Sequence, residues 1–474
     1  MGSSPEPQFF NIINDELRGA SDHHQVTDPR TEEPLWPCPV ATTQDFEDAV
    51  TAARNAFPAW SKSTVAERQA VLVKLAEGLK ENRQELEEIV MKETGKTALM
   101  AQIEIDACIN QCMYYTRVSL ADEVQFEDDK QKIIATHIPL GVVAAICPWN
   151  FPLILSSIKV FSSIVTGNCV IVKPSPFTPY CVLKWVELAR GILPPGVFQA
   201  LNGGADLGAA MTSHPGIDKI SFTGTIATGK KVMAACAKTL KKVTLELAGN
   251  DAAVVTADID IPTVAAKVAT GGFFNAGQMC VATKRVYVHG SIYDEFLDAL
   301  VKEVEKGYTI QEDATTPGVF GPLDNKMQYD VVKGMLEDCR QHGYKIRTGG
   351  KVREKGFWLE PTVVEKPSED APLVKEEQFG PILPVMSWSD EDDVIKRANL
   401  ANAGLGASVY CRDLANAERI ARRLEAGSVF INQSERPNPV AYFSGFKDSG
   451  FGGEMGKQGL LSYCYTQSLH IAKA

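Results

Sequence analysis

The sequence predicts an α/β fold built from two doubly wound lobes, each a parallel sheet with helices on both faces. From Gly141 onward, short runs of β-branched residues alternate with longer stretches of helical periodicity. A second series of the same kind resumes after Thr263. The chain has 474 residues, which is too long for one ordinary hydrophobic core. Strand–helix alternation implies right-handed crossovers and therefore parallel sheets.

The N-terminal part of the chain has two textures. Residues 1 to about 40 are rich in proline and polar residues, and we expect them to be irregular. After Thr43, apolar residues recur at helical spacing, as in Leu72, Leu75 and Leu79. Helices are therefore predicted over 43–58, 65–93 and 96–118.

The first lobe follows from the alternation that begins at Gly141. Its strands are predicted at Gly141–Cys147, Cys169–Lys173, Val197–Leu201, Lys219–Phe222 and Val243–Leu247. Its helices are predicted around 154–165, 179–192, 205–212 and 227–240. Before it, residues 123–138 are charged with apolar residues at intervals, which is typical of a surface hairpin.

The second lobe follows from the alternation after Thr263. Its strands are predicted at Arg285–His289, Gly380–Trp388, Ala407–Cys411 and Ser428–Asn432. Its helices are predicted at 292–305, 326–342, 390–401 and 414–425. The end of the chain, Leu461–Ala472, alternates again and is expected to add a strand to another sheet.

Composition excludes several classes of protein. There are 48 Lys and Arg against 59 Asp and Glu, a net charge of -11, and no basic run, so we expect no nucleic-acid partner. No segment has the ~18 apolar residues that cross a bilayer, and the N-terminus lacks signal-peptide features. The 11 cysteines form no CxxC pair and the seven histidines no ligand pattern. We therefore expect a cytoplasmic protein with reduced thiols, no membrane contact and no metal site.

Two loops after predicted strands carry candidate binding groups, because ligands of doubly wound sheets bind at the carboxyl ends of the strands. In Pro148–Pro152, two prolines flank Asn150, whose amide could stabilise an oxyanion; the alternative is a rigid turn. Lys173 ends a buried strand, where a cation needs an anion or a hydroxyl partner.

Three further features are ambiguous by themselves. The turn Phe222–Thr225 could present backbone N–H groups to a phosphate, but Lys231 stands where a P-loop needs Ser or Thr, and no GxGxxG is present. Glu246 lies in an apolar strand, as a general base would, although a strand carboxylate can also point outward. Cys280 by itself is most simply an inert core thiol.

Taken together and in order, the motifs resemble the signature blocks of the aldehyde dehydrogenase superfamily. The resemblance runs from about residue 27 to the C-terminus. The blocks are Pro148–Pro152, Ile171–Ser175, Ser221–Gly224, Glu246–Asn250, Gly277–Cys280, Glu376–Pro381 and Gly445–Gly450.

The resemblance implies NAD(P)-dependent oxidation of an aldehyde to a carboxylic acid through a thioester. Cys280 would be the nucleophile. The Asn150 amide and the Cys280 backbone N–H would hold the oxyanion, and Glu246 would activate water for hydrolysis. Lys159 and Glu454 would assist proton transfer. The presence of all these residues speaks against a non-catalytic structural member of the family.

The resemblance also implies the remaining site residues. Lys173 would bind the adenosine ribose, Trp149 and Thr225 the phosphates, and Glu377 the nicotinamide ribose, with Phe379 against the ring. The other implied cofactor contacts are Ser175, Gly208, Phe222, Gly224 and Leu247. The implied substrate pocket consists of Phe151, Ile158, Met279, Val281 and Phe443, whose apolar character favours an aliphatic or aromatic aldehyde.

Three departures from the family pattern bear on function. Pro176 stands where many NAD-preferring members have Glu, which leaves NAD and NADP open, with a slight preference for NAD. The Glu246 block reads Glu-Leu-Ala-Gly-Asn instead of Glu-Leu-Gly-Gly-Lys, and we expect only local repacking. Gly453 precedes Glu454 where Arg is frequent. A CoA-acylating enzyme is the alternative activity, although such enzymes typically lack the deacylating Glu.

The resemblance implies a division of the chain as well. Residues 1–118 and 139–248 would form a Rossmann-like NAD(P)-binding domain, and 249–460 the catalytic domain, which is a second Rossmann-like lobe. Residues 119–138 and 461–474 would form a small bridging sheet that supports a homodimer or homotetramer.

Overall fold

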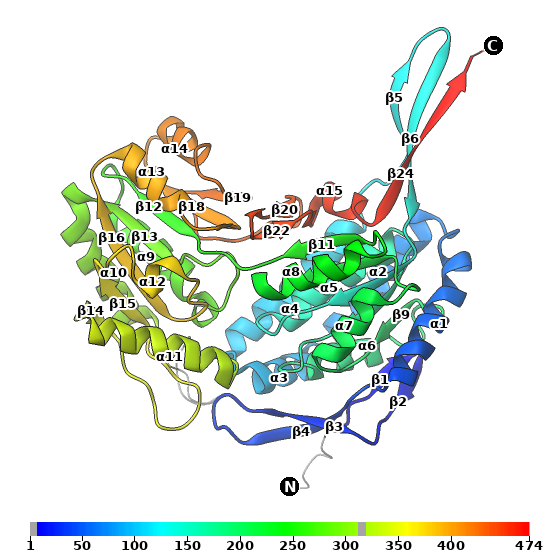
Figure 1. The fold of residues 1–474 in the computed structure, drawn as a ribbon, viewed down its shortest axis with the longest axis horizontal. Coiled ribbons are helices and arrows are strands. Elements are labelled where there is room, and N and C mark those ends of the chain that lie inside the picture. Colours follow the sequence, from blue (N-terminus) through cyan, green and yellow to red (C-terminus); the bar gives the residue numbers. More distant parts are fainter. Residues whose placement is uncertain (1–6, 311–318, 474) are drawn as a thin grey trace.

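The computed structural model describes residues 7–310 and 319–473. It shows two large sheets with helices on both faces and a small third sheet that projects from the body (Figure 1). The predicted α/β architecture is confirmed. The predicted domain limits remain a prediction, and their endpoints at residues 1 and 474 lie outside the described residues.

The first sheet has eight strands. In spatial order they are β2 (Glu16–Arg18), β1 (Asn11–Ile13), β9 (Phe198–Ala200), β8 (Cys169–Lys173), β7 (Val142–Ile146), β10 (Lys219–Thr223), β11 (Lys242–Glu246) and β22 (Gly450–Phe451). The five strands from β9 to β11 are parallel, as predicted. Strand order reverses beside β7, since β8 and β9 lie on one side of it and β10 and β11 on the other.

Helices cover both faces of this sheet. On one face lie α1 (Thr43–Trp60), α7 (Ala205–Ser213) and α8 (Ile226–Ala237). On the other lie α5 (Pro152–Val165) and α6 (Tyr180–Leu188), covered in turn by α2 (Val65–Glu81), α3 (Arg83–Thr94) and α4 (Ala98–Tyr115). The single helix predicted over 65–93 is wrong, because Asn82 leaves helical geometry at φ -104° and ψ 19° and divides it in two.

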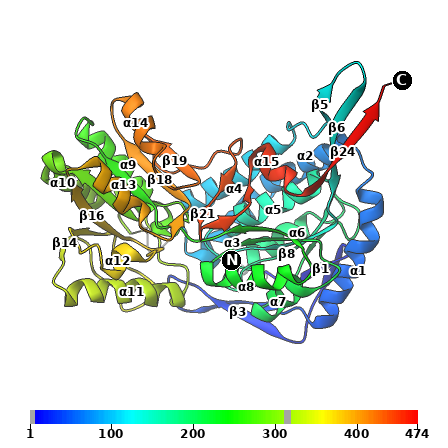
Figure 2. The same cartoon turned by 45° about the horizontal axis from the view of Figure 1, so that its top comes forward.

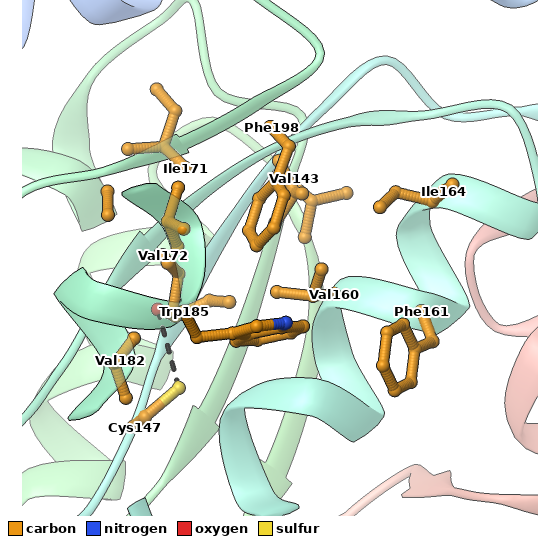
Figure 3. Close-up of a cluster of buried hydrophobic side chains, with 14 of the residues drawn as sticks. Val143, Cys147, Val160, Phe161, Ile164, Ile171, Val172, Val182, Trp185 and Phe198 are labelled. Carbon is orange, nitrogen blue, oxygen red and sulfur yellow. Dashed lines mark hydrogen bonds between the residues drawn. The ribbon is translucent and has the colours of Figure 1, made fainter. Parts of the chain in front are cut away.

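Two aromatic side chains join the inner helices to the sheet. Trp185 of α6 packs edge-on against Phe161 of α5 and against Phe198 of β9, with ring centroids 5.5 and 5.1 Å apart. Figure 3 shows these rings among Val143, Val160 and other apolar side chains. Burial of large aromatic side chains contributes strongly to a core, so α5 is held firmly against the sheet.

The second sheet has seven strands. They are β14 (Lys345–Thr348), β15 (Thr362–Glu365), β16 (Ile382–Trp388), β13 (Arg285–His289), β12 (Ala252–Val255), β18 (Gly406–Tyr410) and β19 (Ser428–Ile431). Its helices are α9 (Ile261–Phe273), α10 (Tyr293–Gly307), α11 (Lys326–Gln341), α12 (Pro372–Lys375), α13 (Glu391–Asn399) and α14 (Leu414–Ala421), with 3-10 turns η1 (Phe274–Gly277) and η2 (Gly290–Ile292).

Successive residues of β12 point to opposite faces of this sheet. Ala253 and Val255 pack in a core with α9 and α10, whereas Ala252 and Val254 pack in a core with α13 and α14. Sequence reasoning missed β12, β14 and β15, which have four residues each. The Ala-Ala-Val-Val of β12 is short and follows β11 with no helix between them, so it falls outside the strand–helix alternation.

The third sheet is antiparallel and joins distant parts of the chain. It pairs β24 (Cys464–Ala472) with β6 (Gln131–Pro139), and β6 with β5 (Glu123–Glu127). This confirms the predicted hairpin and the added last strand. Both views show the three strands extending away from the two large sheets (Figures 1 and 2). A short helix, α15 (Gly456–Leu461), leads into β24.

The expectation that residues 1 to about 40 are irregular is wrong for the described part. Besides β1 and β2, this segment forms the hairpin β3 (His23–Thr27) and β4 (Pro34–Pro39). Strand β1 is buried and pairs with β9 through Ile12 and Ala200, so tertiary contacts stabilise strands that are too short to show periodicity. The remaining small pairs are β17 (Ala403–Gly404) with β21 (Phe446–Lys447) and β20 (Phe443–Ser444) with β23 (Gly453–Glu454). Across the described residues, every helix is too short or too polar to cross a membrane.

Candidate active site

The carboxyl edge of the first sheet carries the candidate loops from its parallel strands. Asn150 and Thr225 lie in the loops after β7 and β10, whereas Lys173 and Glu246 are the last residues of β8 and β11. These four strands are adjacent in the sheet. The reversal of strand order beside β7 places these residues at the position where doubly wound sheets bind ligands. These four residues therefore lie along one edge of the sheet.

The segment before Cys280 has an unusual backbone. Asn275, Ala276 and Gly277 all have left-handed conformations, with φ of 50°, 55° and 71°. A Cβ on Gly277 would lie 2.4 Å from the Gly380 carbonyl oxygen, so this position requires glycine. Non-glycine residues with positive φ are strained and concentrate at functional sites. The turn is fixed by Asn275, whose side chain donates to the Asn150 carbonyl at 3.3 Å and the Gln278 carbonyl at 3.2 Å.

The structure distinguishes Cys280 from the other cysteines. Cys280 is half-buried, whereas the other ten thiols are buried. Burial, followed by the nearby Glu246 charge, raises the pKa of the Cys280 thiol well above its usual value. The Glu246 carboxylate beside Cys280 is a group that could accept the proton of this thiol.

Glu246 belongs to a buried chain of polar groups. The Lys159 ammonium donates to the Thr223 hydroxyl at 2.8 Å, and that hydroxyl donates to Glu246 Oε2 at 3.1 Å. Lys159 also donates to both oxygens of Glu454, at 2.7 and 2.9 Å, and the Ser221 hydroxyl donates to Glu454 Oε1 at 2.6 Å. The chain thus links Lys159 and Glu454 with Glu246.

This environment shifts the pKa values of Glu246 and Lys159. Burial raises the pKa of Glu246, against the opposing effect of the Lys159 cation. Burial alone would lower the pKa of Lys159, but the Glu454 charge and other nearby negative groups raise it. Within the described residues, the buried atom Glu246 Oε1 has no hydrogen-bond partner. It is therefore free to accept a proton from a thiol or a water molecule.

Asn150 connects the first sheet to the nucleophile loop. It is buried, and its Nδ2 donates to the Gln278 carbonyl at 3.1 Å. An amide NH₂ has two hydrogens, so one donor remains. The structure thus places the Asn150 amide beside the Cys280 loop, as an oxyanion donor requires.

The predicted adenosine-ribose group contains an incompletely bonded buried cation. Lys173 is 5% exposed, and its Nζ donates to the Pro174 carbonyl at 3.2 Å. Burial lowers the pKa of Lys173 to about 8. A Cβ on Gly208 would lie 3.9 Å from Lys173 Cε, which brings these two residues together. The hydroxyl of buried Ser175 is used within its own turn, where it accepts from the Phe177 amide at 3.2 Å. Within the described residues, Pro174 is the one hydrogen-bond partner of this ammonium, and its other donors fit the hydroxyls of a ribose.

The start of α8 presents an anion-binding geometry. Thr225 is its N-cap, and the side chain accepts a bond from the Thr228 amide at 3.3 Å. A Cβ on Gly224 would lie 2.6 Å from the Phe222 ring, so this glycine lets the turn fold over Phe222. Leu247 packs against α8 at Gly229, where an added Cβ would lie 2.5 Å away. The exposed, positive end of α8 suits a phosphate.

The predicted nicotinamide residues, Glu377 and Phe379, come from the second sheet and lie close to Trp149, a predicted phosphate contact from the first. The rings of Trp149 and Phe379 meet edge to face, with centroids 5.3 Å apart. Glu377 Oε1 accepts from the Gly249 amide at 3.3 Å and pairs with Lys284 at 3.1 Å. Burial raises the pKa of Glu377, and Lys284 opposes this effect. Asn250, one of the departures from the family pattern, donates to the Val374 and Lys375 carbonyls and so fixes the segment before Glu377.

All five residues of the implied substrate pocket lie in one apolar cluster. Cys280 packs at its edge. The cluster contains Phe151, Ile158, Met279, Val281 and Phe443, together with Leu155, Phe274, Leu405 and Met455. The rings of Phe151 and Phe274 stack with centroids 6.2 Å apart.

Sequence reasoning missed several residues at this site. Thr223 and Ser221 stood within a recognised block, but only the structure shows that they bond to Glu246 and Glu454. Lys284 carried no signal, since a lysine four residues after a cysteine has no motif. In the described part of the chain, no group of three or more His, Cys, Asp or Glu residues could hold a metal ion.

Comparison with known proteins agrees with this geometry. The model of the aldehyde dehydrogenase family matches residues 17–469. The chain is 42% identical over 469 residues to the putative aldehyde dehydrogenase FUS7 of Gibberella fujikuroi, covering 98% of this chain and 99% of that one. It is 42% identical to the aldehyde dehydrogenase LUC3 of a Fusarium species over 468 residues, covering 98% and 99%.

Solved structures give the same result. A Bacillus cereus aldehyde dehydrogenase in complex with NAD⁺ superposes with a TM-score of 0.94 at 33% identity, covering 98% of this chain and 97% of that one. An NADP-dependent enzyme of E. coli superposes with a TM-score of 0.94 at 32% identity, covering 98% of both chains. The chain belongs to the aldehyde dehydrogenase family, and it is an oxidoreductase that acts on aldehydes with a nicotinamide cofactor.

Proposed function

We propose that this protein oxidises an apolar aliphatic or aromatic aldehyde to the free carboxylic acid through a thioester on Cys280. The observation that carries the proposal is the position of Cys280. It is the half-buried thiol among buried ones, at the edge of an apolar cluster and beside the Glu246 carboxylate.

The first half of the reaction forms the carbon–sulfur bond. Glu246 accepts the thiol proton, and the Cys280 sulfur donates an electron pair to the aldehyde carbon. The carbonyl electrons move to the oxygen, which is held by the Asn150 amide and the Cys280 backbone N–H. When bound, the nicotinamide cofactor supplies the acceptor for the hydrogen and electron pair that this carbon loses. The acyl group then remains attached to Cys280 as a thioester.

The second half breaks that bond. Glu246 removes a proton from water, the water oxygen bonds to the acyl carbon, and the carbon–sulfur bond breaks to release the acid. Glu246 therefore accepts a proton twice in one cycle and must lose the first before the second. The hydrogen-bonded groups Thr223, Lys159 and Glu454 support a route for that proton.

The proposed cofactor residues follow the carboxyl edge of the first sheet. Lys173, Ser175 and Gly208 would hold the adenosine ribose. Phe222, Gly224, Thr225 and Leu247 would form the phosphate end at α8 together with Trp149, and Glu377 and Phe379 would lie at the nicotinamide. The free donors of Lys173 and the uncovered start of α8 support this assignment. Pro176 offers no carboxylate that would repel a 2′-phosphate, so both NAD and NADP can bind. We expect a slight preference for NAD.

The proposal is tested by following reduced cofactor by absorbance, with NAD and NADP in parallel, across aliphatic and aromatic aldehydes. We expect turnover that Cys280→Ala abolishes, a loss on the order of 10⁴–10⁶-fold, while cofactor binding by calorimetry persists. Turnover in Cys280→Ala would exclude the thioester route.

The second candidate activity, acyl transfer to coenzyme A, is separated by product analysis. Glu246 at the reaction centre favours water as the acceptor, so we expect the free acid both with and without CoA. An acyl-CoA product, with no acid in its absence, would establish the alternative.

The projecting sheet supports a homodimer or homotetramer. Its strands expose the apolar side chains of Val124, Phe126, Ile138, Leu469 and Ile471. Such a concentration on three extended strands is typical of a contact between subunits. Light scattering should give a mass of two or four chains, and Phe126→Glu with Leu469→Glu should reduce it. A wild-type monomer would contradict the proposal.

A cytoplasmic location rests on the thiols. All 11 cysteines are free, and buried reduced thiols suit a reducing compartment. Microscopy of the tagged protein in its own cell tests this, and an organellar signal would contradict it.

A further inference from the structure

We propose that Lys284 is a positioning residue that ties the Cys280 loop to the Glu377 carboxylate and so couples the nucleophile to the cofactor site. The inference rests on the proposed function, because it takes Cys280 as the nucleophile and Glu377 as a cofactor-binding group. It adds a residue that none of the motifs contains.

The bonds of Lys284 are the first argument. Its side chain is 2% exposed, and its Nζ lies 2.8 Å from the Met279 carbonyl oxygen, 3.4 Å from the Cys280 carbonyl oxygen and 3.1 Å from Glu377 Oε1. An ammonium has three hydrogens, so these three acceptors use all of them. The three acceptors belong to residues of the proposed substrate pocket, the nucleophile and the cofactor site.

The burial of this cation is the second argument. A lysine that is removed from water is costly unless it is paired and fully hydrogen-bonded. Lys284 recovers that cost through the carbonyls beside the nucleophile and through Glu377. Its Nζ also lies 5.6 Å from the centroid of the Phe379 ring, which meets Trp149. The Lys284 ammonium thus lies near the nucleophile loop, the Glu377 carboxylate and the Phe379 ring.

The third argument is that the two carboxylate oxygens of Glu377 have different roles. Oε1 is occupied by Lys284 and by the Gly249 amide, at 3.1 and 3.3 Å. These two bonds hold Oε1 and orient the carboxylate, and we assign Oε2 to a hydroxyl of the ligand. If Lys284 is removed, Glu377 loses its ionic partner and its orientation.

The charges around this group set the direction of the test. Four acidic groups interact electrostatically with Cys280 or with Lys284. They are Glu246, Asp251, Glu377 and Glu435. Lys284 is the cation that lowers the pKa of Cys280 against burial and these carboxylates. Loss of this positive charge should therefore make Cys280 harder to deprotonate.

The experiment compares Lys284→Met with Lys284→Arg, and uses Lys326→Met as the matched control. Lys326 is exposed and pairs with Asp330 in α11, so it tests the same change outside the site. Iodoacetamide labelling of Cys280 is followed by mass spectrometry against pH without cofactor, and cofactor affinity is measured by calorimetry.

For Lys284→Met we expect the pH midpoint of Cys280 labelling to rise by about one unit. We also expect the cofactor Kd to rise about tenfold. Lys284→Arg should restore most of both, and Lys326→Met should match the wild type. A folded Lys284→Met protein with wild-type labelling and wild-type Kd would overturn the inference.

Removing the cation leaves Glu377 as an unpaired buried carboxylate, which could prevent folding. In that case the double variant Lys284→Met/Glu377→Gln is compared with Glu377→Gln alone, and the same upward shift in labelling midpoint is expected. No shift between these two proteins would also overturn the inference. Neither readout needs aldehyde turnover, so the failure of the proposed function is distinguishable. If the proposed function is wrong, iodoacetamide should label Cys280 of the wild-type protein no faster than the other thiols.

Discussion

The two large sheets contribute to the active site from opposite ends of their strands. In the first sheet, Asn150 and Glu246 follow or end strands β7 and β11, at the carboxyl edge. In the second sheet, Cys280 and Glu377 precede strands β13 and β16, at the amino edge. The rule that ligands bind at the carboxyl ends of doubly wound strands therefore finds the first group and misses the second.

The connection between the sheets explains this difference. The chain leaves the first sheet at the carboxyl end of β11, after Glu246, and enters the second at the amino end of β12, at Ala252. A short crossing of this kind brings the carboxyl edge of one sheet against the amino edge of the other. The strained turn at Asn275–Gly277 then carries Cys280 to the interface. Substitutions in either sheet should therefore change the activity of the shared site.

The largest expected effect comes from removing the base that the first sheet supplies. Glu246→Gln should slow deacylation about 10²–10⁴-fold, because the amide cannot accept a proton from water. A covalent acyl-enzyme should accumulate and be visible as an added acyl mass on the intact protein. Glu337→Gln, at an exposed carboxylate of α11, is the control. Wild-type turnover by Glu246→Gln would show that another group is the deacylation base.

The next effect concerns the amide that bridges the sheets. Asn150→Ala should lower kcat about 10²–10³-fold, since a donor to the developing oxyanion is lost. It also removes the bond to the Gln278 carbonyl, so thermal unfolding should be measured alongside. A fall in kcat with an unchanged cofactor Kd would show that the substitution affects the reaction at Cys280, the nucleophile that precedes β13 of the second sheet. A change confined to KM would instead assign Asn150 to substrate binding.

A smaller effect is expected at the ribose end, which belongs to the first sheet alone. Pro176→Glu should raise the KM for NADP about tenfold, because a carboxylate would repel the 2′-phosphate. The KM for NAD should change little. Pro195→Glu, at an exposed proline, is the control for the added charge. Equal effects on both cofactors would show that residue 176 does not face the 2′ position.

The smallest expected effect is a pH shift between the sheets. The Glu246 charge raises the pKa of Cys280, so its removal in Glu246→Gln should lower that pKa. The pH midpoint of iodoacetamide labelling should therefore fall by about one unit. This is the opposite of the direction expected for Lys284→Met. An unchanged midpoint would mean that the two side chains do not interact across the interface.

The sequence by itself determined the periodic parts of the molecule and the ordered set of motifs. Alternating β-branched and helical stretches identified β7, β8, β10, β11, β13 and the helices between them, because each of these strands is a five-residue run next to a helical stretch. The projecting hairpin and the last strand were also found. The motif order identified the family, since Asn150, Glu246 and Cys280 occur within its blocks.

Only the tertiary structure decided the rest. Strands β1 and β12 are short and fully buried, and they are stable because neighbouring strands pair with them. The exposure that separates Cys280 from ten buried thiols depends on a left-handed turn, which no local spacing reveals. Lys284 lies beside Glu377 because β13 and β16 are neighbours in the sheet. Contacts between residues that are distant in sequence depend on strand order, and strand order is fixed by packing of the whole chain.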